Sequence, residues 1–510
     1  MVSTVATALV ALLVSLLFVH QRQRSARRPP GARGLPLIGN AFQIPKDKQW
    51  LVWDKWRRKH GDLVSFRILG SENLVLSSYE AATELLDTRG LLYSDRPQAT
   101  MAGELVGWNR GMGYSPGPPN PRFRELRRLF HTFIGPRACD AKDLQTVQEE
   151  ESIKLLDKLL DTPHEFMAHT RDSTAAVLLR LAYGYDPSQN RNDPISLVKI
   201  VQDAMDGFSL ASEPGWWCDT SPGPRSCLCQ TDAARPGAPV QIPFDYVKQE
   251  RLKGTSKRSF ISTFLDERHG EETTEDEDII NAAAASLYSG GAETTVASLD
   301  SHFLAMTLFP HIQHKAQSTL DTYLLHSLPR TNQRLPTISD RPHLPYLEAL
   351  MYEILRWNPS VPLGLPHVAT QDDEYRGYTI QKGTVVWANI WSILQDEDVF
   401  PDPTEFRPER YLDQDGRIAK SSKQVLAVKT AFGFGRRVCP GLYLAENSVF
   451  LAIAMFLFAL DVSPHEDRLP EVEYNGFISH PRPFKCKIRP RSPEVAQLIR
   501  DRVQTLKQTD

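Results

Sequence analysis

The chain has few cysteines for its length and no large excess of either charge. Six cysteines in 510 residues are too few for a disulfide scaffold, which indicates a thiol-reducing compartment in which a functional cysteine acts as a thiolate. The 59 basic and 62 acidic side chains give a net charge of −3, so the strong positive field of a nucleic-acid-binding protein is missing. We therefore expect a small or apolar partner and no nucleic acid.

The sequence has no internal repeats and no region whose amino-acid composition would mark a second domain. It also lacks a complete dinucleotide-binding fingerprint. The sequence GFGRRV around Gly435 has only two of the three glycines that such a fingerprint requires. The composition, 41% hydrophobic and 24% charged, is that of a globular protein with a sizeable core. One large domain without a flavin or nicotinamide site of its own is therefore predicted.

The N-terminus, by contrast, holds a long uncharged run. Residues 1–21 are apolar enough to span a bilayer as one helix, and four arginines follow within the next seven residues. The positive-inside rule then places the following chain in the cytosol. A cleaved signal peptide is the alternative, but its leading positive charge and small-residue cleavage site are missing. We expect an anchor over 1–21, a basic, proline-rich linker over 22–40, and a catalytic domain over 41–510.

One internal segment differs from its surroundings. Residues 214–243 contain six prolines and half of all the cysteines, so they cannot form one helix. The segment has neither helical nor strand periodicity, which indicates a loop, a disordered insert or a stretch that is not native coding sequence. Its cysteines Cys218, Cys227 and Cys229 have no fourth Cys or His nearby and fit no common zinc site.

Helical patterns dominate the remainder of the chain. A strand-type alternation around Gly70 predicts a β-hairpin, and residues 373–391 form a second strand-rich stretch. Apolar stripes of helical period predict helices around Glu84 and Leu155 and over residues 276–309 and 346–357. The predicted fold is mainly α with a small β-rich lobe.

A glycine-containing loop carries Cys439 to the start of a strongly apolar helix. Backbone N–H groups and the helix dipole stabilise a thiolate there, and a thiolate can be an axial ligand of heme iron. Phe432 can cover the sulfur, Gly435 permits the turn, Gly441 leaves room for a flat macrocycle and Arg437 can pair with a propionate. An ordinary buried cysteine is the alternative for a single Cys–x–Gly.

Five positions together resolve this choice. Phe432, Gly435, Arg437, Cys439 and Gly441 match F–x–x–G–x–R–x–C–x–G, the heme-binding signature of the cytochromes P450, so the chain resembles that family. The resemblance extends from the anchor to about Arg489. The phrases MAGELVGW, LPHVATQDDEYRGYTI and FRPERYLDQDGR resemble fungal microsomal members of the O-methylsterigmatocystin oxidoreductase kind.

An acid and a base lie three residues apart on the helix predicted over 346–357. Glu353 and Arg356 share one helix face and can form an ion pair, for which a solvated surface pair is the ordinary interpretation. In the family, an E–x–x–R helix precedes an F–x–P–x–R segment and then the heme loop, and FRPER ends here at Arg410. The resemblance implies that Glu353, Arg356 and Arg410 form a buried network that supports the heme loop.

Two glycines interrupt the alanine-rich helix predicted over 276–309. Gly290 and Gly291 each cost about 1 kcal/mol relative to alanine, so close approach of a flat ligand or a local widening that admits water is expected. The sequence SGGAETT resembles the family's distal motif, which implies that Glu293 and Thr294 deliver protons for O–O cleavage. A flexible helix with exposed polar side chains is the alternative.

Two further basic residues resemble ligands of the heme propionates. Arg127 lies in RFRELRRLFH, which is similar to the family's W–x–x–x–R segment except that Phe123 replaces the tryptophan. His367, in GLPHVAT, matches another basic propionate position. A surface cation is the alternative for either residue.

The resemblance implies the cytochrome P450 fold, with heme b between the long distal helix and the cysteine helix. It implies a monooxygenase that acts with O2 on a lipophilic fungal metabolite or xenobiotic. Its electrons would come from a separate NADPH-dependent flavoprotein reductase, or from cytochrome b5, docked on the cysteine side near Arg436. A single-pass endoplasmic reticulum membrane protein with a cytosolic catalytic domain is expected. The predicted, mostly apolar cavity lining is Met101 to Trp108, Ser286 to Gly290, Val361 to Leu365, Phe477 and Ile478.

Two other functions fit parts of the sequence. A heme-thiolate isomerase or dehydratase would rearrange a peroxide without a reductase, although such enzymes usually lack the acid–threonine pair. An inactive, membrane-anchored heme binder, or a product of faulty splicing, would explain residues 214–243.

Overall fold

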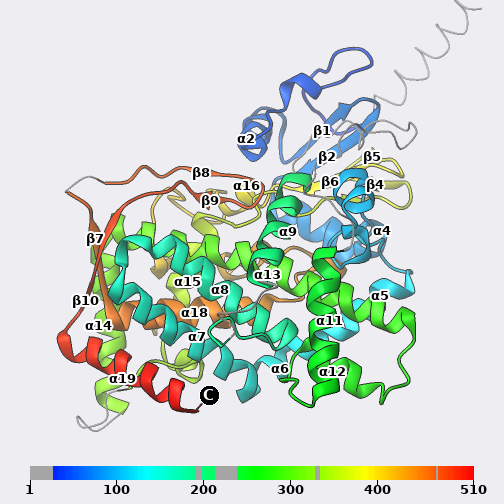
Figure 1. The fold of residues 1–510 in the computed structure, drawn as a ribbon. Helices are drawn as coiled ribbons and strands as arrows, with labels where there is room; N and C mark the ends of the chain where they lie inside the picture. The colour runs from blue at the N-terminus through cyan, green and yellow to red at the C-terminus, as the bar shows by residue number, and fades with distance from the viewer. Residues whose placement is uncertain (1–26, 190–196, 213–237, 328–333, 467–468, 510) are drawn as a thin grey trace, which may run out of the picture.

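Helices make up most of the molecule, and the strands lie at its margins (Figure 1). The computed structural model describes residues 27–189, 197–212, 238–327, 334–466 and 469–509. The longer helices are α2 (Gln49–His60), α5 (Pro121–Ile134), α7 (Lys142–Asp161), α8 (Phe166–Tyr183), α9 (Leu197–Ser212), α11 (Ala238–Lys253), α12 (Phe260–Glu267), α13 (Thr274–Leu308), α14 (Pro310–Ser327), α15 (Pro345–Trp357), α18 (Leu442–Ala459) and α19 (Pro493–Thr509). The short helices are α3 (Tyr79–Ala82), continued by a π-helix (Thr83–Thr88), α4 (Gly90–Tyr93), α6 (Pro136–Cys139), α16 (Ile390–Leu394) and α17 (Lys423–Val428).

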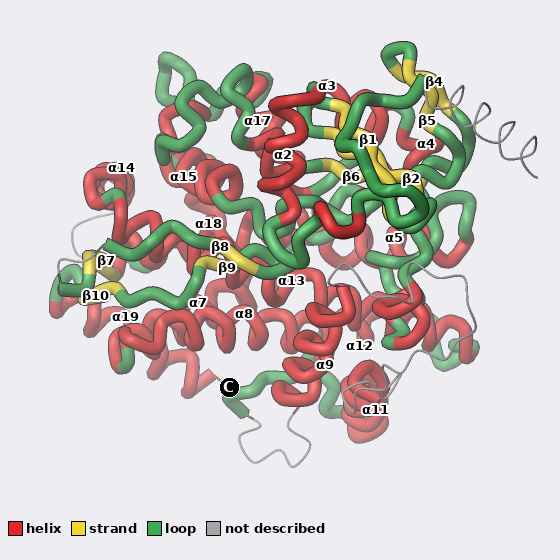
Figure 2. The backbone as a smooth tube through the Cα atoms, turned by 90° about the horizontal axis from the view of Figure 1, so that it is seen from above, coloured by secondary structure: helices red, strands yellow, loops and turns green. Residues whose placement is uncertain are grey.

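The strands form one four-stranded sheet and three two-stranded sheets. They are β1 (Leu63–Ile68), β2 (Ser71–Leu76), β3 (His367–Val368), β4 (Asp373–Tyr375), β5 (Tyr378–Ile380), β6 (Val385–Ala388), β7 (Leu460–Pro464), β8 (Tyr474–Asn475), β9 (His480–Pro481) and β10 (Cys486–Pro490). The main sheet has the order β1-β2-β6-β3. Figure 2 shows this sheet at one end of the molecule and β7 and β10 at the other, next to α14 and α19. The predicted mainly helical fold with a small β-rich lobe is confirmed.

The hairpin predicted around Gly70 is confirmed as β1 and β2. Leu63 pairs with Leu76 and Ile68 with Ser71, and Gly70 supplies the turn with a φ of +89°. β2 then runs parallel to β6, which comes from the strand-rich stretch 373–391. Segments far apart in the sequence are thereby joined in one sheet.

Residues 29–40 belong to the folded domain, although we predicted a linker there. The Pro30 carbonyl accepts the Ser65 N–H at 2.8 Å, and the Asn40 N–H donates to the Arg67 carbonyl at 2.6 Å. This pairing occurs because β1 is the edge strand of its sheet and its outer backbone groups need partners. The proline-fixed, extended backbone of the segment supplies them.

The segment 214–243 lies mostly outside the described residues, including its three cysteines. Residues 238–243 are described, and they form the beginning of α11, with Pro243 inside the helix. The expectation of a loop is therefore wrong for this part. Phe244 and Val247 are buried against apolar side chains of α8, α12 and α13, and this burial stabilises α11 although Pro243 removes one N–H donor.

The anchor predicted over 1–21 also lies outside the described residues. Within the described part of the chain, α18 is the one helix long and apolar enough to cross a membrane, and 78% of it is buried inside the protein. The apolar character of α18 therefore comes from its place in the core, where Phe450 and Ile453 are fully buried.

The central element of the fold is α13. Thr273 caps its start, since its hydroxyl accepts the Asp276 N–H while the Asp276 carboxylate accepts the Thr273 N–H. The helix runs without interruption over 35 residues, so of the two alternatives expected at Gly290 and Gly291 a break that widens the helix is not seen, and close approach of a flat ligand stays a prediction. A Cβ on Gly291 would lie 3.0 Å from Leu178 Cδ2, so this glycine allows α8 to pack closely.

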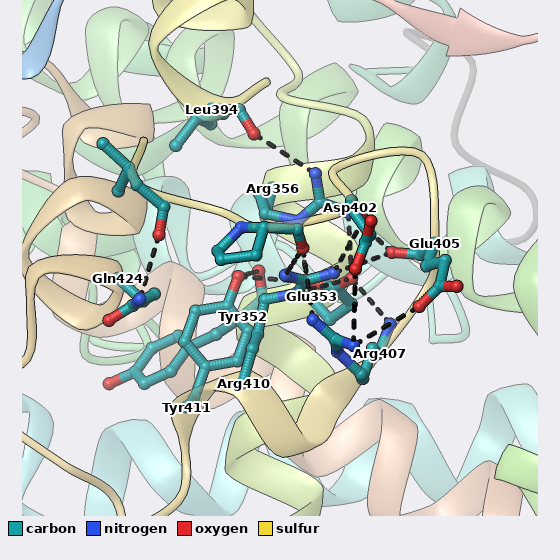
Figure 3. A network of polar contacts seen from close by, with 12 residues as sticks. Tyr352, Glu353, Arg356, Leu394, Asp402, Glu405, Arg407, Arg410, Tyr411 and Gln424 are labelled. Atoms are coloured by element: carbon teal, nitrogen blue, oxygen red, sulfur yellow. Dashed lines mark hydrogen bonds and ion pairs between the residues drawn. The ribbon is translucent and has the colours of Figure 1, made fainter. Parts of the chain in front are cut away.

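Glu353, Arg356 and Arg410 meet in one buried network (Figure 3). Arg356 Nε lies 2.8 Å from Glu353 Oε2, and both side chains are 0% exposed. Arg410 Nε lies 3.3 Å from the same carboxylate, which also accepts the Tyr411 hydroxyl at 3.1 Å. The expected i,i+3 ion pair is therefore present and inaccessible to solvent.

This network fastens residues 394–411 to α15. Arg356 donates to the carbonyls of Leu394 and Glu405, each at 3.2 Å, and Arg410 donates to the Pro401 carbonyl at 2.9 Å. The same segment leads through α17 to the loop that carries Cys439. The network thus fixes the approach to this loop from a distance and does not touch the cysteine itself.

Replacing Glu353 by glutamine should destabilise the protein strongly. The substitution leaves Arg356 charged and buried without an anion, which costs about 3–5 kcal/mol. Urea unfolding of the heme-loaded protein measures this free energy. The matched control is Lys158→Gln, which breaks a half-exposed pair with Asp172 (3.3 Å) and should cost less than about 1 kcal/mol. An equal decrease in the free energy of unfolding in the two variants would show that the network does not stabilise the protein.

Candidate active site

One large cavity lies between α13 and the N-terminal end of α18. Its walls carry mainly apolar side chains from α5, α8, α13, α15 and the loops that follow α15. The members of the predicted lining that border it are Trp108, Ser286, Leu287, Ser289, Gly290, Val361, Gly364, Leu365, Phe477 and Ile478. The helix α13 and the two predicted loop segments after it therefore meet in one space.

The first part of the predicted lining faces elsewhere. Met101 and Ala102 pack with Ala211 of α9 in a small separate apolar cluster. Of the side chains that the structure describes in the predicted stretch 101–108, Trp108 is the one that borders the cavity. The difference arises because a π-helix over Thr100–Leu105 turns these side chains towards α9.

The loop before α18 depends on its glycines. Gly433 and Gly435 have φ values of +80° and +52°, a region that favours glycine. A Cβ on Gly435 would lie 2.2 Å from the Leu86 carbonyl oxygen, so no side chain fits there. The Cys439 N–H donates to the Phe432 carbonyl at 2.7 Å and closes the loop. Cys439, Phe432 and Gly441 all border the cavity, whereas Gly435 does not.

The surroundings of Cys439 do not by themselves ionise its thiol. Burial raises the pKa of this thiol, and the Gly441 N–H and the charge of Arg127 lower it only in part. The backbone N–H groups at the helix start thus stabilise the thiolate as predicted, but burial destabilises the thiolate by more. A thiol that coordinates a metal ion is deprotonated by it, so a heme iron bound at Cys439 would favour the thiolate form.

Several basic side chains surround the same cavity. Arg127, Arg437 and His367, all predicted as propionate ligands, border it, and Arg96 joins them. Arg437 donates to the carbonyls of Ser94 (2.7 Å) and Ser115 (2.7 Å). The guanidinium of Arg437 also stacks 4.2 Å above the ring of Phe123, the residue that replaces the family's tryptophan.

In the part of the chain that the structure describes, the three arginines of this group pair with backbone carbonyls. Within the described residues, none of the three arginines has a carboxylate oxygen within 4.0 Å. Burial and the charge of Arg437 lower the pKa of Arg96 to about 9, and burial together with Arg127 lowers the pKa of Arg437 to about 10. An arrangement of mutually repelling cations around a cavity fits a ligand that brings carboxylates, as the two propionates of heme do.

Arg96 is the functional residue that the sequence analysis missed. Its guanidinium donates to the carbonyls of Leu365 (2.9 Å) and Pro366 (2.7 Å), next to His367. Burial and the charges of Arg96 and Arg437 keep the pKa of His367 well below its usual range, while its Nδ1 lies 2.6 Å from the Tyr93 carbonyl. The tetrapeptide Ser94 to Pro97 has no periodic pattern, so only the fold reveals the position of Arg96.

The two predicted proton-transfer residues face different sides of α13. Thr294 borders the cavity, and its hydroxyl donates to the Gly290 carbonyl at 2.8 Å. Glu293 does not border it, and its carboxylate pairs with Arg171 of α8 at 3.3 Å and with His480 of β9 at 3.2 Å. The acid and the alcohol are adjacent in the sequence, but the structure does not bring their side chains to the same space.

Known proteins with similar sequences are fungal enzymes. The chain is 40% identical to cytochrome P450 monooxygenase 208 of Postia placenta, over 97% of this chain and 96% of that protein. It is 38% identical to cytochrome P450 monooxygenase claR of Ampulloclitocybe clavipes, over 92% of this chain and 88% of that protein. It is 33% identical to tryptamine 4-monooxygenase of Psilocybe cyanescens, over 96% of this chain and 100% of that protein.

A family model agrees with these relatives and with the site. The model described as cytochrome P450 matches residues 29–488, which include the cysteine loop, the basic side chains around the cavity and the whole of α13. Its first matched residue lies in the segment 29–40, which the structure packs against β1. The chain therefore belongs to the cytochrome P450 family.

Proposed function

We propose that this heme-dependent monooxygenase oxidises a neutral, lipophilic organic molecule with electrons that NADPH supplies through a separate flavoprotein reductase. One observation carries the proposal: Thr294 of α13 and Cys439 of the loop before α18 border the same, mostly apolar cavity. A heme held by Cys439 would face Thr294 across that cavity. The substrate would lie against the apolar walls on the Thr294 side.

The protein's own residues have three tasks in this reaction. Heme, when bound through a thiolate, supplies the chemistry of O2 activation and favours O–O cleavage. Cys439 provides the sulfur ligand, and Arg96, Arg127, Arg437 and His367 surround the space for the propionates. The apolar walls exclude water and orient the substrate.

Proton transfer is assigned to Thr294 and Glu293. The Thr294 hydroxyl donates to the Gly290 carbonyl, and its oxygen stays available as an acceptor on the cavity side. Glu293 would take up a proton from solvent at the outer face of α13 and pass it to the Thr294 hydroxyl after its carboxyl group turns towards Thr294. General acid catalysis of this kind requires a donor within hydrogen-bond reach, directly or through one water.

The cavity favours a neutral substrate. Among the described residues that line it, Glu446 is the only carboxylate, and Arg341 pairs with it at 2.8 Å. A cationic amine would therefore find no free anionic partner in this part of the chain. The relative named for tryptamine acts on an amine, whereas this chain is suited to an uncharged fungal metabolite or xenobiotic.

Exposed basic side chains on the cysteine side fit an acidic redox partner. Arg124, Arg128, Lys429 and Arg436 are all exposed. Charges of one sign around a docking face steer an oppositely charged partner. An NADPH-dependent flavoprotein reductase, with cytochrome b5 as a second electron donor, is the proposed partner.

The proposed location is the endoplasmic reticulum membrane, with the catalytic domain in the cytosol. The uncharged run 1–21 and the arginines that follow it support a single-pass anchor. Leu35 and Leu37 are 54% and 95% exposed in the segment that follows, as expected for a surface that rests on lipid.

Reconstitution with reductase, NADPH and 18O2 tests the proposed reaction. Against a panel of neutral aromatic hydrocarbons and terpenes, the protein should form a hydroxylated product that carries 18O. Thr294→Ala should consume NADPH but release hydrogen peroxide, with product per NADPH reduced about 10- to 100-fold, because the proton donor at the cavity is lost. Thr307→Ala is the matched control, since Thr307 lies on the same helix and makes the same bond to its i−4 carbonyl (2.7 Å).

Three outcomes contradict parts of this proposal. If Thr294→Ala formed as much product per NADPH as the wild type, Thr294 would have no role in proton transfer. Conversion of an organic hydroperoxide without NADPH, together with no NADPH-dependent product, would show an isomerase or dehydratase. Neither product nor peroxide would show an inactive heme binder.

Deleting residues 1–26 should release the protein from membranes without loss of heme. The deletion ends before Arg28, which pairs with Glu72 at 3.0 Å, so the contacts of residues 29–40 with β1 are kept. Sedimentation of the expressed protein and its heme content after purification measure the two effects. Loss of heme in the truncated protein would show that the N-terminal segment is part of the fold, and retention in the membrane pellet would locate the anchor elsewhere.

A further inference from the structure

One row of hydroxyl groups on α13 borders the cavity. Residues four apart lie on one face of an α-helix, so Ser286, Thr294 and Ser298 form a single row that Gly290 completes. Each hydroxyl donates its proton to the carbonyl four residues earlier, to Ala282 at 2.7 Å, Gly290 at 2.8 Å and Thr294 at 3.2 Å. In this arrangement the three oxygens offer lone pairs, and no proton, to a molecule in the cavity.

Ser360 adds a fourth hydroxyl from another part of the chain. It follows α15, is half-buried and borders the same cavity. Its hydroxyl donates to the Thr294 carbonyl at 3.0 Å, and its oxygen lies 3.4 Å from that of Ser298. The protons of both serines are thus directed to one carbonyl, and each oxygen keeps acceptor capacity. Two neighbouring acceptors therefore lie about one helical turn from Thr294.

The position of Ser360 is fixed from behind by its backbone. Its carbonyl accepts the Ser479 N–H at 2.8 Å, and the Ser479 hydroxyl donates to Asn358 Oδ1 at 2.9 Å. The first of these bonds brings Phe477 and Ile478, which also border the cavity, close to Ser360. A hydrogen bond to the Ser360 oxygen would therefore form among apolar side chains, where such a bond is stronger than in water.

The next row of α13 is directed to α8. Gly291 lies against Leu178, since a Cβ on this glycine would be 3.0 Å from Leu178 Cδ2, and Thr295 is four residues farther along the same row. Thr295 borders the cavity too, on its α8 side. The group of acceptors is thus confined to the row of Thr294 and to Ser360.

We propose that Ser360 is a specificity-determining residue and that the substrate is a lipophilic alcohol or phenol, whose hydroxyl donates a hydrogen bond to the Ser360 hydroxyl oxygen. The inference rests on the proposed function, because it takes the cavity beside Thr294 as the substrate site. An O–H group supplies the donor that this wall lacks. A hydrocarbon leaves the two serine oxygens without a donor, and an ether oxygen would face their lone pairs.

Binding of matched ligands to the ferric holoenzyme tests the proposal. Equilibrium dialysis gives the Kd of borneol and of bornyl methyl ether, and likewise of 2-naphthol and 2-methoxynaphthalene. The ratio of the ether Kd to the alcohol Kd should fall about 2- to 10-fold in Ser360→Ala, because one hydrogen bond is lost. Taking this ratio cancels general changes in the shape or hydration of the cavity.

Two further variants separate the hydroxyl from the size of the side chain. Ser360→Thr and Ser360→Val have the same shape, and the ratio should be higher in the threonine variant by a similar factor. Ser301→Ala is the control, because Ser301 lies on α13, donates to the Ala297 carbonyl at 2.6 Å and does not border the cavity. This control should keep the wild-type ratio.

Equal ratios in the wild type and Ser360→Ala, or in the threonine and valine variants, would overturn the proposal. A Ser301→Ala variant that lowered the ratio as much as Ser360→Ala would also overturn it. Failure of the proposed function looks different: the alcohols would bind with the expected preference but would give no 18O-labelled product with reductase and NADPH.

Discussion

The positive charge gathered around the cavity is the constraint on which the site depends. Arg96 holds the carbonyls of Leu365 and Pro366, Arg127 holds the Val438 carbonyl (2.6 Å), and Arg437 holds the loop before α5. Three separate walls are thus tied together by guanidinium groups that repel one another and lower one another's pKa. Heme propionates bound among these groups, as proposed, would relieve this repulsion, so heme binding and formation of the walls would stabilise each other.

Around this centre, α13 separates two chemical environments. Its inner face brings Thr294 to the cavity, and its outer face holds Glu293 among Arg171 and His480. In the proposed reaction, a proton from solvent would therefore pass from the charged outer face of the helix to its apolar inner face. The network around Glu353 lies farther from the reaction and fixes the segment that leads to the cysteine loop (Figure 3).

The sequence revealed the parts of the site that are local in the chain. The helices over 276–309 and 346–357 have long, strong patterns, and the cysteine loop has its glycines and ligand within ten residues, so both were predictable. Arg96 was not, because its neighbours come from residues 365–366 and only the folded chain unites them. The direction of Glu293 was missed for a similar reason: the motif gives its spacing from Thr294, but the partners on α8 and β9 decide which way it points.

The central claim is that Cys439 binds heme iron through its sulfur, and the ferrous–carbonyl spectrum tests it most directly. A thiolate opposite carbon monoxide moves the Soret band far to the red of the position given by a histidine-ligated or unligated heme. The wild type and the control Cys486→Ser, which alters a buried cysteine in β10, should show the red-shifted band. Cys439→His should lose it while the Cys486→Ser band remains. A red-shifted band that survived in Cys439→His, or disappeared only in Cys486→Ser, would contradict the assignment of the ligand.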